Sequence, residues 1–376
     1  MTSIKEFVSV YEKFAPKKLI MGGDPTGLHF GHPDQEITKV MTTLDVRPEV
    51  VDEAVARGVD FILAHHPPIF KPAKNLVEDD PQNHMYAQLI RHNIGVYASH
   101  TNLDVVAGGM NDWLADALDL TNLQILSPTY QADQYKLVVY VPQEASDQVL
   151  SACHDKGAGQ VGDFYQDVST SIPALGRFTP KAGAKPAIGQ VDQAEEVQED
   201  RLEVLVDEDD LDQVISALLE AHPYEEPVYD VFKLEGACKS QGIGRVGDLS
   251  QVMTLEDLLA HIKKSFDLQG LRYVQVPNTK LKTFQKIAIC GGDGSSFIQD
   301  AINSGADAYI TGDVYYHTAH DLQAAGLTVI DPGHHTEAIC IPKLAQKVQE
   351  WIQAYNWPIQ VVQSQVNTEP FEFYTK

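Results

Sequence analysis

Cysteine is scarce in this chain, and the cysteines that occur are dispersed. None belongs to a CxxC pair; they are Cys153, Cys238, Cys290 and Cys340. This spacing argues against a zinc site built from cysteines and against a framework of disulfide bonds. Long hydrophobic runs are also missing, since no apolar stretch approaches the ~18 residues of a membrane span and the N-terminus has no apolar signal segment. We therefore expect a soluble protein of a reducing compartment, and we assign it to the cytoplasm.

Positive charge is in short supply, with 28 Lys and Arg residues against 53 Asp and Glu residues and a formal net charge of -25. Such a chain repels phosphate backbones, which disfavours direct binding of nucleic acids. The pattern GxSxG and the spacings of a phosphate-binding loop or a dinucleotide fingerprint do not occur. The glycine-rich stretch CGGDGSS (290–296) is better explained as a tight turn between a strand and a helix than as an anion site.

The first and last thirds of the chain alternate strand and helix patterns, and the length of 376 residues allows two domains. VDFILAHH (59–66) is typical of a buried strand, and PEVVDEAVARG (48–58) begins with a proline that the first turn of a helix tolerates. Later, the strand pattern LTVIDPGHH (327–335) precedes a long helical pattern over 336–355. Continuous apolar strands alternating with helices predict an α/β domain with mostly parallel sheets and helices outside.

The middle third contains an internal duplication. LVVYVPQEASDQVLSA (137–152) matches LEVLVDEDDLDQVISA (202–217) at a constant offset of 65, and each copy joins a strand to a helix. The alternative is that two ordinary amphipathic helices share common residues by chance. Two such units, each followed by more strand-like sequence, predict a ferredoxin-like α+β domain. We expect this domain at 130–236, inserted into an α/β domain made of 1–129 and 237–376.

Polar residues with metal-binding side chains follow the predicted strands. In an open parallel sheet the carboxyl ends of the strands line the ligand crevice, so these residues should converge although they lie far apart in the sequence. They are Asp45, His65, His66, His100, Asp104, Asp313, His334, His335 and Glu337. Imidazole and carboxylate groups together predict a divalent-metal site, for which zinc, iron and manganese are all suitable.

The neighbouring histidines His65 and His66 raise a geometric question, because adjacent side chains of a strand point to opposite faces. Pro67 biases His66 toward extended geometry, so we expect the two rings to diverge. Diverging rings suit two ions set roughly 3.5–4 Å apart better than one shared tetrahedral ion. In GHHTE, His334 and Glu337 are three positions apart and share a face if a helix begins there.

Two further histidines are candidates for moving protons in catalysis. His100 is either such a group, a residue that orients a metal ligand, or a structural histidine. His317 is either a pocket residue or an ordinary polar residue of an amphipathic helix. Both are candidate catalytic residues. In the turn-rich stretch GDPTGLHFG, Asp24 is the residue that we single out for a possible chemical role.

Several motifs resemble, in the same order, those of the NIF-three-like family, whose bacterial members are named GTP cyclohydrolase I type 2 homologues. These motifs are HHPPIF, SHTNLD, GGDGSS, ITGDVYYH and GHHTE. KLVVYVP, GAGQVGDF and AHPYEEPVYDV resemble the insertion of the longer members, so the resemblance covers essentially the whole chain. It implies an α/β domain with a dinuclear metal site, an inserted domain similar to PII and CutA proteins, and a homohexameric toroid.

The resemblance also implies which residues hold two divalent ions of zinc, iron or manganese. Carried onto the matching positions, the ligands are His65, His66, Asp104, His334 and Glu337. Glu337 would bridge the ions. The pair His65 and His334 would hold one ion, and His66 with Asp104 would hold the other.

Two functions of different classes fit these features. A metal-activated water and a proton shuttle would make the protein a hydrolase of a small anionic or nucleotide substrate. The alternative is a metal-binding scaffold or regulator without catalysis, whose inserted domain senses a ligand. The alternative is favoured by the scarcity of Arg and Lys near the site motifs, since Arg177, Lys181 and Lys185 lie in the expected insertion. A third interpretation, binding to a transcription factor, draws only on the family's historical name.

Overall fold

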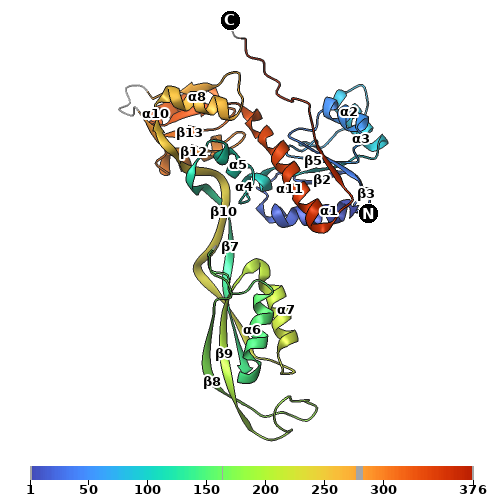
Figure 1. The fold of residues 1–376 in the computed structure, drawn as a ribbon, viewed down its shortest axis with the longest axis vertical. Helices are drawn as coiled ribbons and strands as arrows, with labels where there is room; N and C mark the ends of the chain where they lie inside the picture. The colour runs from blue at the N-terminus through green and yellow to red at the C-terminus, as the bar shows by residue number, and fades with distance from the viewer. Residues whose placement is uncertain (1, 163, 277–282, 375–376) are drawn as a thin grey trace. The chain divides into compact units, whose positions relative to one another are not determined.

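The computed structural model describes residues 2–162, 164–276 and 283–374. Two compact units make up the chain, one combining Met1–Tyr130 with Gln241–Lys376 and the other consisting of Gln131–Ser240. Strands β7 (Thr121–Pro142) and β10 (Tyr229–Met253) each run from one unit into the other (Figure 1).

The first unit contains a five-stranded sheet in the order β15–β4–β5–β6–β2. Its strands are β2 (Gly27–Phe30), β4 (Lys39–Thr43), β5 (Phe61–Ala64), β6 (Gly95–Ala98) and β15 (Gln360–Gln363). Neighbouring strands from β15 to β6 are parallel, whereas β2 pairs antiparallel with β6. The carboxyl ends of β4, β5 and β6 therefore meet at one edge of the sheet.

The apolar run at 59–66 forms β5, and both faces of this strand are buried. Phe61 and Leu63 pack into one hydrophobic cluster, whereas Ile62 and Ala64 pack into another. Successive strand residues point to opposite faces, so each face of the sheet has its own core. Burial on both faces explains why the run lacks polar alternation.

A second sheet of the first unit contains three parallel strands, β12, β13 and β14. Their bounds are Phe284–Ile289, Ala308–Ile310 and Thr328–Asp331. The antiparallel neighbours are β11 (Arg272–Val274), which pairs with β14, and β10, which pairs with β12. β1 (Thr2–Ser3) and β3 (Glu36–Ile37) form a separate short ladder. The carboxyl ends of β12, β13 and β14 form a second edge.

Helices cover the sheets of the first unit. They are α1 (Ile4–Phe14), α2 (Pro48–Ala56), α3 (Pro81–Arg91), α4 (Thr101–Val105), α5 (Met110–Ala117), α8 (Leu255–Ser265), α9 (Ile298–Asn303), α10 (Tyr316–Ala325) and α11 (Cys340–Tyr355), with 3₁₀ helices η1 (Lys17–Leu19), η4 (Ser295–Phe297) and η5 (His334–Ile339). Asp80 caps α3 and Thr254 caps α8 by accepting hydrogen bonds from amides of the first turn. Phe7 and Tyr11 of α1 meet Trp351 of α11 edge-on, with ring centroids 6.3 and 5.8 Å apart. This aromatic packing holds α11, which follows directly on the GHHTE motif.

The second unit has the element order β7–α6–β8–β9–α7–β10 and the sheet order β8–β9–β7–β10. The new elements are α6 (Ser146–His154), β8 (Ser169–Phe178), β9 (Glu195–Asp207) and α7 (Leu211–Ala221), with 3₁₀ helices η2 (Gln143–Ala145) and η3 (Glu208–Asp210). Helices α6 and α7 lie side by side (Figure 1), and Val149 and Val214 from these helices join Val139 and Val204 in one core.

The internal duplication is visible in the pairing of β7 with β9. The central pairs are Leu137 with Val204, Val138 with Glu203 and Val139 with Leu202. Residues 65 positions apart exchange places across this ladder, and the middle pair joins two equivalent positions. A local two-fold axis therefore passes through Val138 and Glu203.

The expected mixed α/β fold of sheets and helices is confirmed. The element ends differ from the sequence prediction in two places that matter for the site. β5 ends at Ala64, before the two histidines that were expected to belong to it. The helix expected over 336–355 begins instead as the 3₁₀ helix η5 and becomes an α-helix only at Cys340. Every helix within the described ranges is too short or too polar to cross a lipid bilayer.

Candidate metal centre

Side chains from both sheets of the first unit meet beyond the carboxyl ends of their parallel strands. The segments after β5 and β6 contribute His65, His66 and Asp104. The segment after β14 contributes His334 and Glu337. These five residues form groups of three in which the ligand atoms lie within 4.8 Å of one another. The structure thus brings together all five side chains that the resemblance implied as metal ligands.

The rings of His65 and His66 lie side by side rather than on opposite faces. Their centroids are 4.8 Å apart and their planes are inclined by 43°. Because β5 ends at Ala64, neither histidine is held to the alternation of a strand, and the expected divergence is wrong. Both Nε2 atoms approach Oε2 of Glu337, at 3.7 Å from His65 and 3.1 Å from His66.

A first group of ligand atoms comes from His65, Asp104 and Glu337, which are 0%, 7% and 2% exposed. His65 donates from Nδ1 to the carbonyl oxygen of Ser99 over 2.8 Å, which leaves the lone pair on Nε2 for another partner. That Nε2 lies 3.6 Å from Oδ1 of Asp104. Neither atom has a hydrogen-bond partner in the part of the chain that the structure describes. Buried polar atoms are almost always partnered, so two facing acceptors mark a position for a cation.

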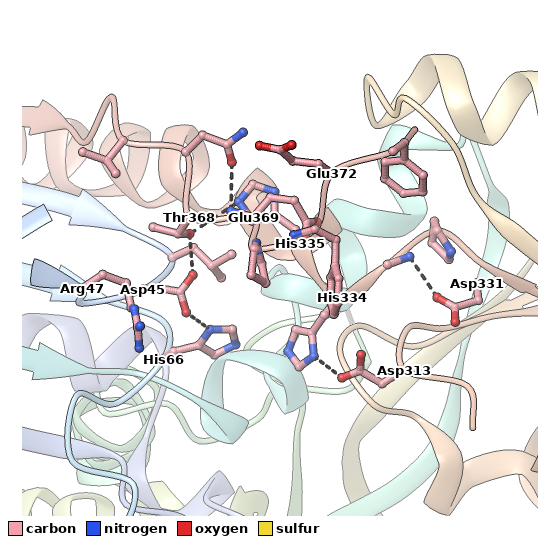
Figure 2. A pocket seen from close by; sticks show the side chains of 18 of the residues that line it. Asp45, Arg47, His66, Asp313, Asp331, His334, His335, Thr368, Glu369 and Glu372 are labelled. Carbon is pink, nitrogen blue, oxygen red and sulfur yellow. Dashed lines mark hydrogen bonds and ion pairs between the residues drawn. The ribbon is translucent and has the colours of Figure 1, made fainter. Parts of the chain in front are cut away.

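A second group comes from His66, His334 and Glu337, with Oε2 of Glu337 3.1 Å from Nε2 of each histidine. His334 and Glu337 are three residues apart in η5, and a 3₁₀ helix places such side chains above one another. Nδ1 of His66 faces Oδ1 of Asp45 at 2.7 Å, and Nδ1 of His334 faces Oδ2 of Asp313 at 2.7 Å (Figure 2). These two carboxylates orient the rings so that both Nε2 atoms point toward Glu337.

Glu337 belongs to both groups, which is the geometry of a bridging ligand. The other four candidate ligands are grouped differently from the arrangement that the resemblance implied. His65 lies with Asp104 rather than with His334, and His66 lies with His334 rather than with Asp104. The chain path accounts for the difference. β5 and β6 are adjacent strands, so His65 meets Asp104 within its own sheet, while His66 is one residue further out and reaches the second sheet.

At the edge of this cluster, His100 forms a third group of possible ligand atoms with His65 and His66. Its ring centroid is 5.3 Å from that of His65 and 5.6 Å from that of His66. Its Nδ1 donates to Oδ1 of Asp24 over 2.6 Å. Thr26 and Thr101 each donate to the other oxygen of Asp24 over 2.6 Å. Asp24 therefore holds the ring of His100 beside the candidate ligands, a role that the sequence did not indicate.

His317 is not brought into the cluster. It is exposed on α10, where its ring lies 5.4 Å from that of Tyr316. Within the described residues it joins none of the candidate ligand groups and does not line the cavity that opens onto His334. This placement agrees with an ordinary polar residue of an amphipathic helix.

The glycine-rich stretch 290–296 contacts the cluster directly. A Cβ atom on Gly291 would lie 2.7 Å from Oε1 of Glu337, and one on Gly292 would lie 3.0 Å from the same atom. Gly292 also has a φ of 57°, which glycine adopts without strain. These glycines form the turn between β12 and η4. They are also needed for a second reason, because a larger side chain at either position would occupy the space of Glu337.

A cavity of about 920 Å³ opens onto His66 and His334. This volume suits a small-molecule ligand. Arg47 and Arg272 are the two cationic side chains on its walls, and they stand among a larger number of acidic ones: Asp45, Glu49, Asp313, Asp331, Glu369 and Glu372. Arg272 is hydrogen-bonded to Asp331, whereas Arg47 is exposed at the start of α2.

The C-terminal segment, residues 366–373, forms another wall of this cavity (Figure 2). Oγ1 of Thr368 donates to Oδ2 of Asp45 over 2.5 Å, so the segment braces the carboxylate that orients His66. A Cβ atom on Gly270 would lie 2.8 Å from the ring of Phe373, which shows how closely the segment packs. The end of the chain is thus part of the site.

The sequence matches the Duf34/NIF3 (NGG1p interacting factor 3) family over residues 2–370. The chain belongs to this family. A Bacillus subtilis relative named GTP cyclohydrolase 1 type 2 homolog is 41% identical over 369 residues, which cover 98% of each chain. A Listeria monocytogenes relative of the same name is 40% identical over 368 residues, again 98% of each chain. The resemblance seen in the motifs is confirmed.

Solved structures agree with this assignment to Duf34/NIF3. The crystal structure of a Bacillus cereus protein related to NIF3 has a TM-score of 0.92 at 38% identity and covers 99% of both chains. A Staphylococcus aureus protein, SA1388, has a TM-score of 0.78 at 29% identity with the same coverage. The mixed α/β fold of the chain is therefore the fold of its relatives.

The electrostatics of this Duf34/NIF3 site depend on burial. Burial lowers the pKa of His65 to about 3, and burial with the nearby charge of Glu337 raises the pKa of Asp104 well above its usual value. Burial opposes charge on His66, but hydrogen bonds to two carboxylates raise its pKa to about 10. The hydrogen bond to Glu337 outweighs burial and raises the pKa of His334 to about 9. The positive charges of protonated His66 and His334 thus compensate the negative charge of Glu337. A divalent cation bound at Glu337 would displace these protons.

The donor set fits a pair of divalent ions. One group offers an imidazole nitrogen and two carboxylates, and the other offers two imidazole nitrogens and a carboxylate, with one carboxylate common to both. Mixed nitrogen and oxygen ligands of this kind suit zinc, iron and manganese alike. Asp45 and Asp313 complete the arrangement by holding Nδ1 of two candidate ligand rings, those of His66 and His334.

Replacing Asp313 by asparagine is expected to weaken metal binding about 10–100-fold, because the carboxylate that orients His334 and increases its basicity is lost. Competition with a chromogenic chelator measures the affinity. Asp321→Asn is the matched control, since Asp321 is exposed on α10 away from the cavity. Equal affinities of the two variants would show that Asp313 does not act on the ligand.

Proposed function

We propose that the protein is a dinuclear divalent-metal hydrolase acting on a small anionic substrate of the nucleotide class. The observation that carries this proposal is the placement of Glu337 between a buried group and a half-buried group of ligand atoms beside an open cavity. Arg47 and Arg272 on the cavity walls suit the phosphate groups of such a substrate. The relatives' name, GTP cyclohydrolase 1 type 2 homolog, makes GTP the first substrate to test.

The ligands His65, His66, Asp104, His334 and Glu337 would hold two ions, which when bound supply an activated water and stabilise developing negative charge. His100 is the group to which we assign proton movement. Its Nδ1 is committed to Asp24, so its Nε2 is left to exchange a proton. Burial alone would raise the pKa of Asp24, but hydrogen bonds from His100, Thr101 and Thr26 hold that pKa well below its usual range. Asp24 thus remains ionised and keeps His100 in one tautomer. His317, exposed on α10, receives no role.

Metal-loaded protein is expected to consume at least one nucleotide in a panel that contains GTP, with products separated by chromatography. Asp104→Asn keeps the shape of the side chain but removes a charged ligand, so we expect a loss of rate of more than about 100-fold. Asp321→Asn should keep the rate of the unaltered protein. Full activity in both Asp104→Asn and Glu337→Gln would exclude the metal centre as the catalyst.

The second candidate is a metal-binding scaffold or regulator without turnover. It is supported by a separate cavity of about 890 Å³ in the second unit, lined by residues that take no part in the metal centre. If metal-loaded protein consumes none of the nucleotides and a ligand binds at the second unit instead, this candidate replaces the first.

The inserted domain and the assembly are also proposals. We assign residues 130–236 to a ferredoxin-like domain of PII or CutA type, because β10–β7–β9–β8 is the strand order of that topology, with a helix after β7 and after β9. We also propose a homohexameric ring, as the family resemblance implies, and apolar side chains that this unit leaves exposed, such as Ile172 and Phe232, support association between copies. Light scattering of the purified protein measures the number of copies.

A further inference from the structure

The second unit has a cavity with a chemistry different from that of the metal centre. It is formed by the end of β8 with the segment that follows it, 174–188, and by the segment after α7, 224–228. Its volume of about 890 Å³ is that of a small-molecule site. The motif AHPYEEPVYDV contributes Tyr224, Glu225 and Glu226, which the proposed hydrolase does not use.

Glu199 of β9 is the buried polar group of this cavity. Only 5% of the residue is exposed, and Oε1 accepts a hydrogen bond from the hydroxyl of Tyr224 over 2.8 Å. Within the described residues its carboxylate forms no ion pair with a lysine, arginine or histidine. Gly176 on the adjacent strand makes room for it, since a Cβ atom there would collide with both carboxylate oxygens. A buried carboxylate without a cation is costly, so this position favours a positively charged ligand.

Aromatic rings line the same cavity. Tyr140, Phe178 and Tyr224 line the cavity, and the rings of Phe178 and Tyr224 meet at a centroid distance of 5.8 Å. His222 fixes Tyr224 by accepting its backbone N–H over 3.0 Å at Nδ1, while Nε2 donates to the carbonyl oxygen of Tyr140 over 3.0 Å. Aromatic faces attract organic cations. Tyr224 and the carboxylate that it contacts are therefore held in place before any ligand arrives.

The charges that line the cavity point the same way. Glu225 and Glu226 join Glu199 on the walls, against Arg177 and Lys181. Arg177 is already paired, because its Nε donates to Glu196 over 2.8 Å. The remaining charge is negative, and Glu199 is hydrogen-bonded to Tyr224, which disfavours an anionic ligand beside this ring.

We propose that this cavity binds a small organic cation with a primary ammonium or guanidinium group. The cationic group would bond to Glu199, and the carbon chain would lie against Tyr140, Phe178 and Tyr224. The site does not depend on metal at Glu337 or on nucleotide turnover.

Titration calorimetry of the full-length, metal-loaded protein tests the proposal with agmatine, which carries a guanidinium and an ammonium group, with putrescine, which carries ammonium groups, and with neutral 1,4-butanediol. The buffer should contain about 0.15 M salt to screen the exposed acidic surface. We expect saturable binding of one cation per chain and none of the diol. The stronger of the two cations identifies the preferred group. Glu199→Gln should weaken this binding at least about tenfold, because a charge-assisted hydrogen bond is lost.

Two further variants keep the test decisive. Glu220→Gln changes an exposed acid of α7 outside the cavity and should keep the affinity. Gly176→Ala should weaken binding as Glu199→Gln does, because the new methyl group displaces the carboxylate. Absence of saturable binding by both cations, equal binding of the diol, or equal affinities of Glu199→Gln and Glu220→Gln would overturn the proposal.

Discussion

Replacing Glu337 by glutamine is expected to lower the metal affinity at both positions of the proposed dinuclear centre more than about 100-fold. Loss of a side chain that only orients a ligand costs about 10–100-fold, and Glu337 lies among the ligand atoms of both groups. Its Oε2 atom is 3.1 Å from Nε2 of His66 and of His334, so one substitution affects both positions. Elemental analysis of protein purified without added metal gives the number of ions per chain.

Glu372→Gln is the matched control for this experiment. Glu372 lies on the wall of the same cavity in the C-terminal segment, so the substitution removes the same charge without touching a candidate ligand group. We expect this variant to keep its metal. If Glu337→Gln also kept two ions with unchanged affinity, the shared-carboxylate arrangement would be incorrect, whatever the activity of the protein.

Replacing Arg245 by alanine is expected to lower the free energy of unfolding of the first unit by about 3–5 kcal/mol, the cost of removing one partner of a buried ion pair. Arg245 is 4% exposed and contacts Asp112 through two hydrogen bonds of 2.6 and 2.7 Å. It also donates to the carbonyl oxygens of Gly242 and Gly244 over 2.9 and 2.8 Å. Its loss would leave the partly buried carboxylate of Asp112 without its cation, although the amide of Gly108 still donates to it, and would remove a donor from each of two carbonyl groups.

Urea unfolding followed by tryptophan fluorescence measures this effect selectively. The three tryptophans are Trp113, Trp351 and Trp357, all in the first unit. Arg91→Ala is the matched control, because Arg91 makes an equally bidentate pair with Glu78 at the exposed surface, where water replaces the lost contacts. A shift of the midpoint as large for Arg91→Ala as for Arg245→Ala would contradict the role given to burial.

The candidate ligands could be predicted because they depend on one general rule. Parallel strands end at a common edge, so His66 after β5 and His334 after β14 could be expected to converge from sequence positions far apart. The expectation for the pair His65 and His66 failed because it depended on where β5 ends. β5 ends two residues earlier than expected, so His65 and His66 are not held to the alternating side-chain directions of a strand. Their rings lie side by side instead.

The supporting residues of the site could not be predicted, because they act through contacts between distant segments. The bond of His100 to Asp24 spans 76 residues, and that of Thr368 to Asp45 spans 323. Neither pair has a spacing that a local pattern would reveal. Gly291 appeared as a turn residue, and only the tertiary structure shows that its missing side chain admits Glu337.

The ladder between β7 and β9 has the symmetry expected of two equivalent strand–helix units. In a dimer of two identical strand–helix units, the residue on the two-fold axis faces its own copy. Here one copy has Val138 at that position and the other has Glu203. Lys136 and Arg201, equivalent to each other across the axis, both pair with Glu203, at 3.6 and 2.9 Å. A dimer of identical copies would place two glutamates, or none, on its axis. A single glutamate that pairs with two symmetry-related cations is therefore possible only when both units belong to one chain.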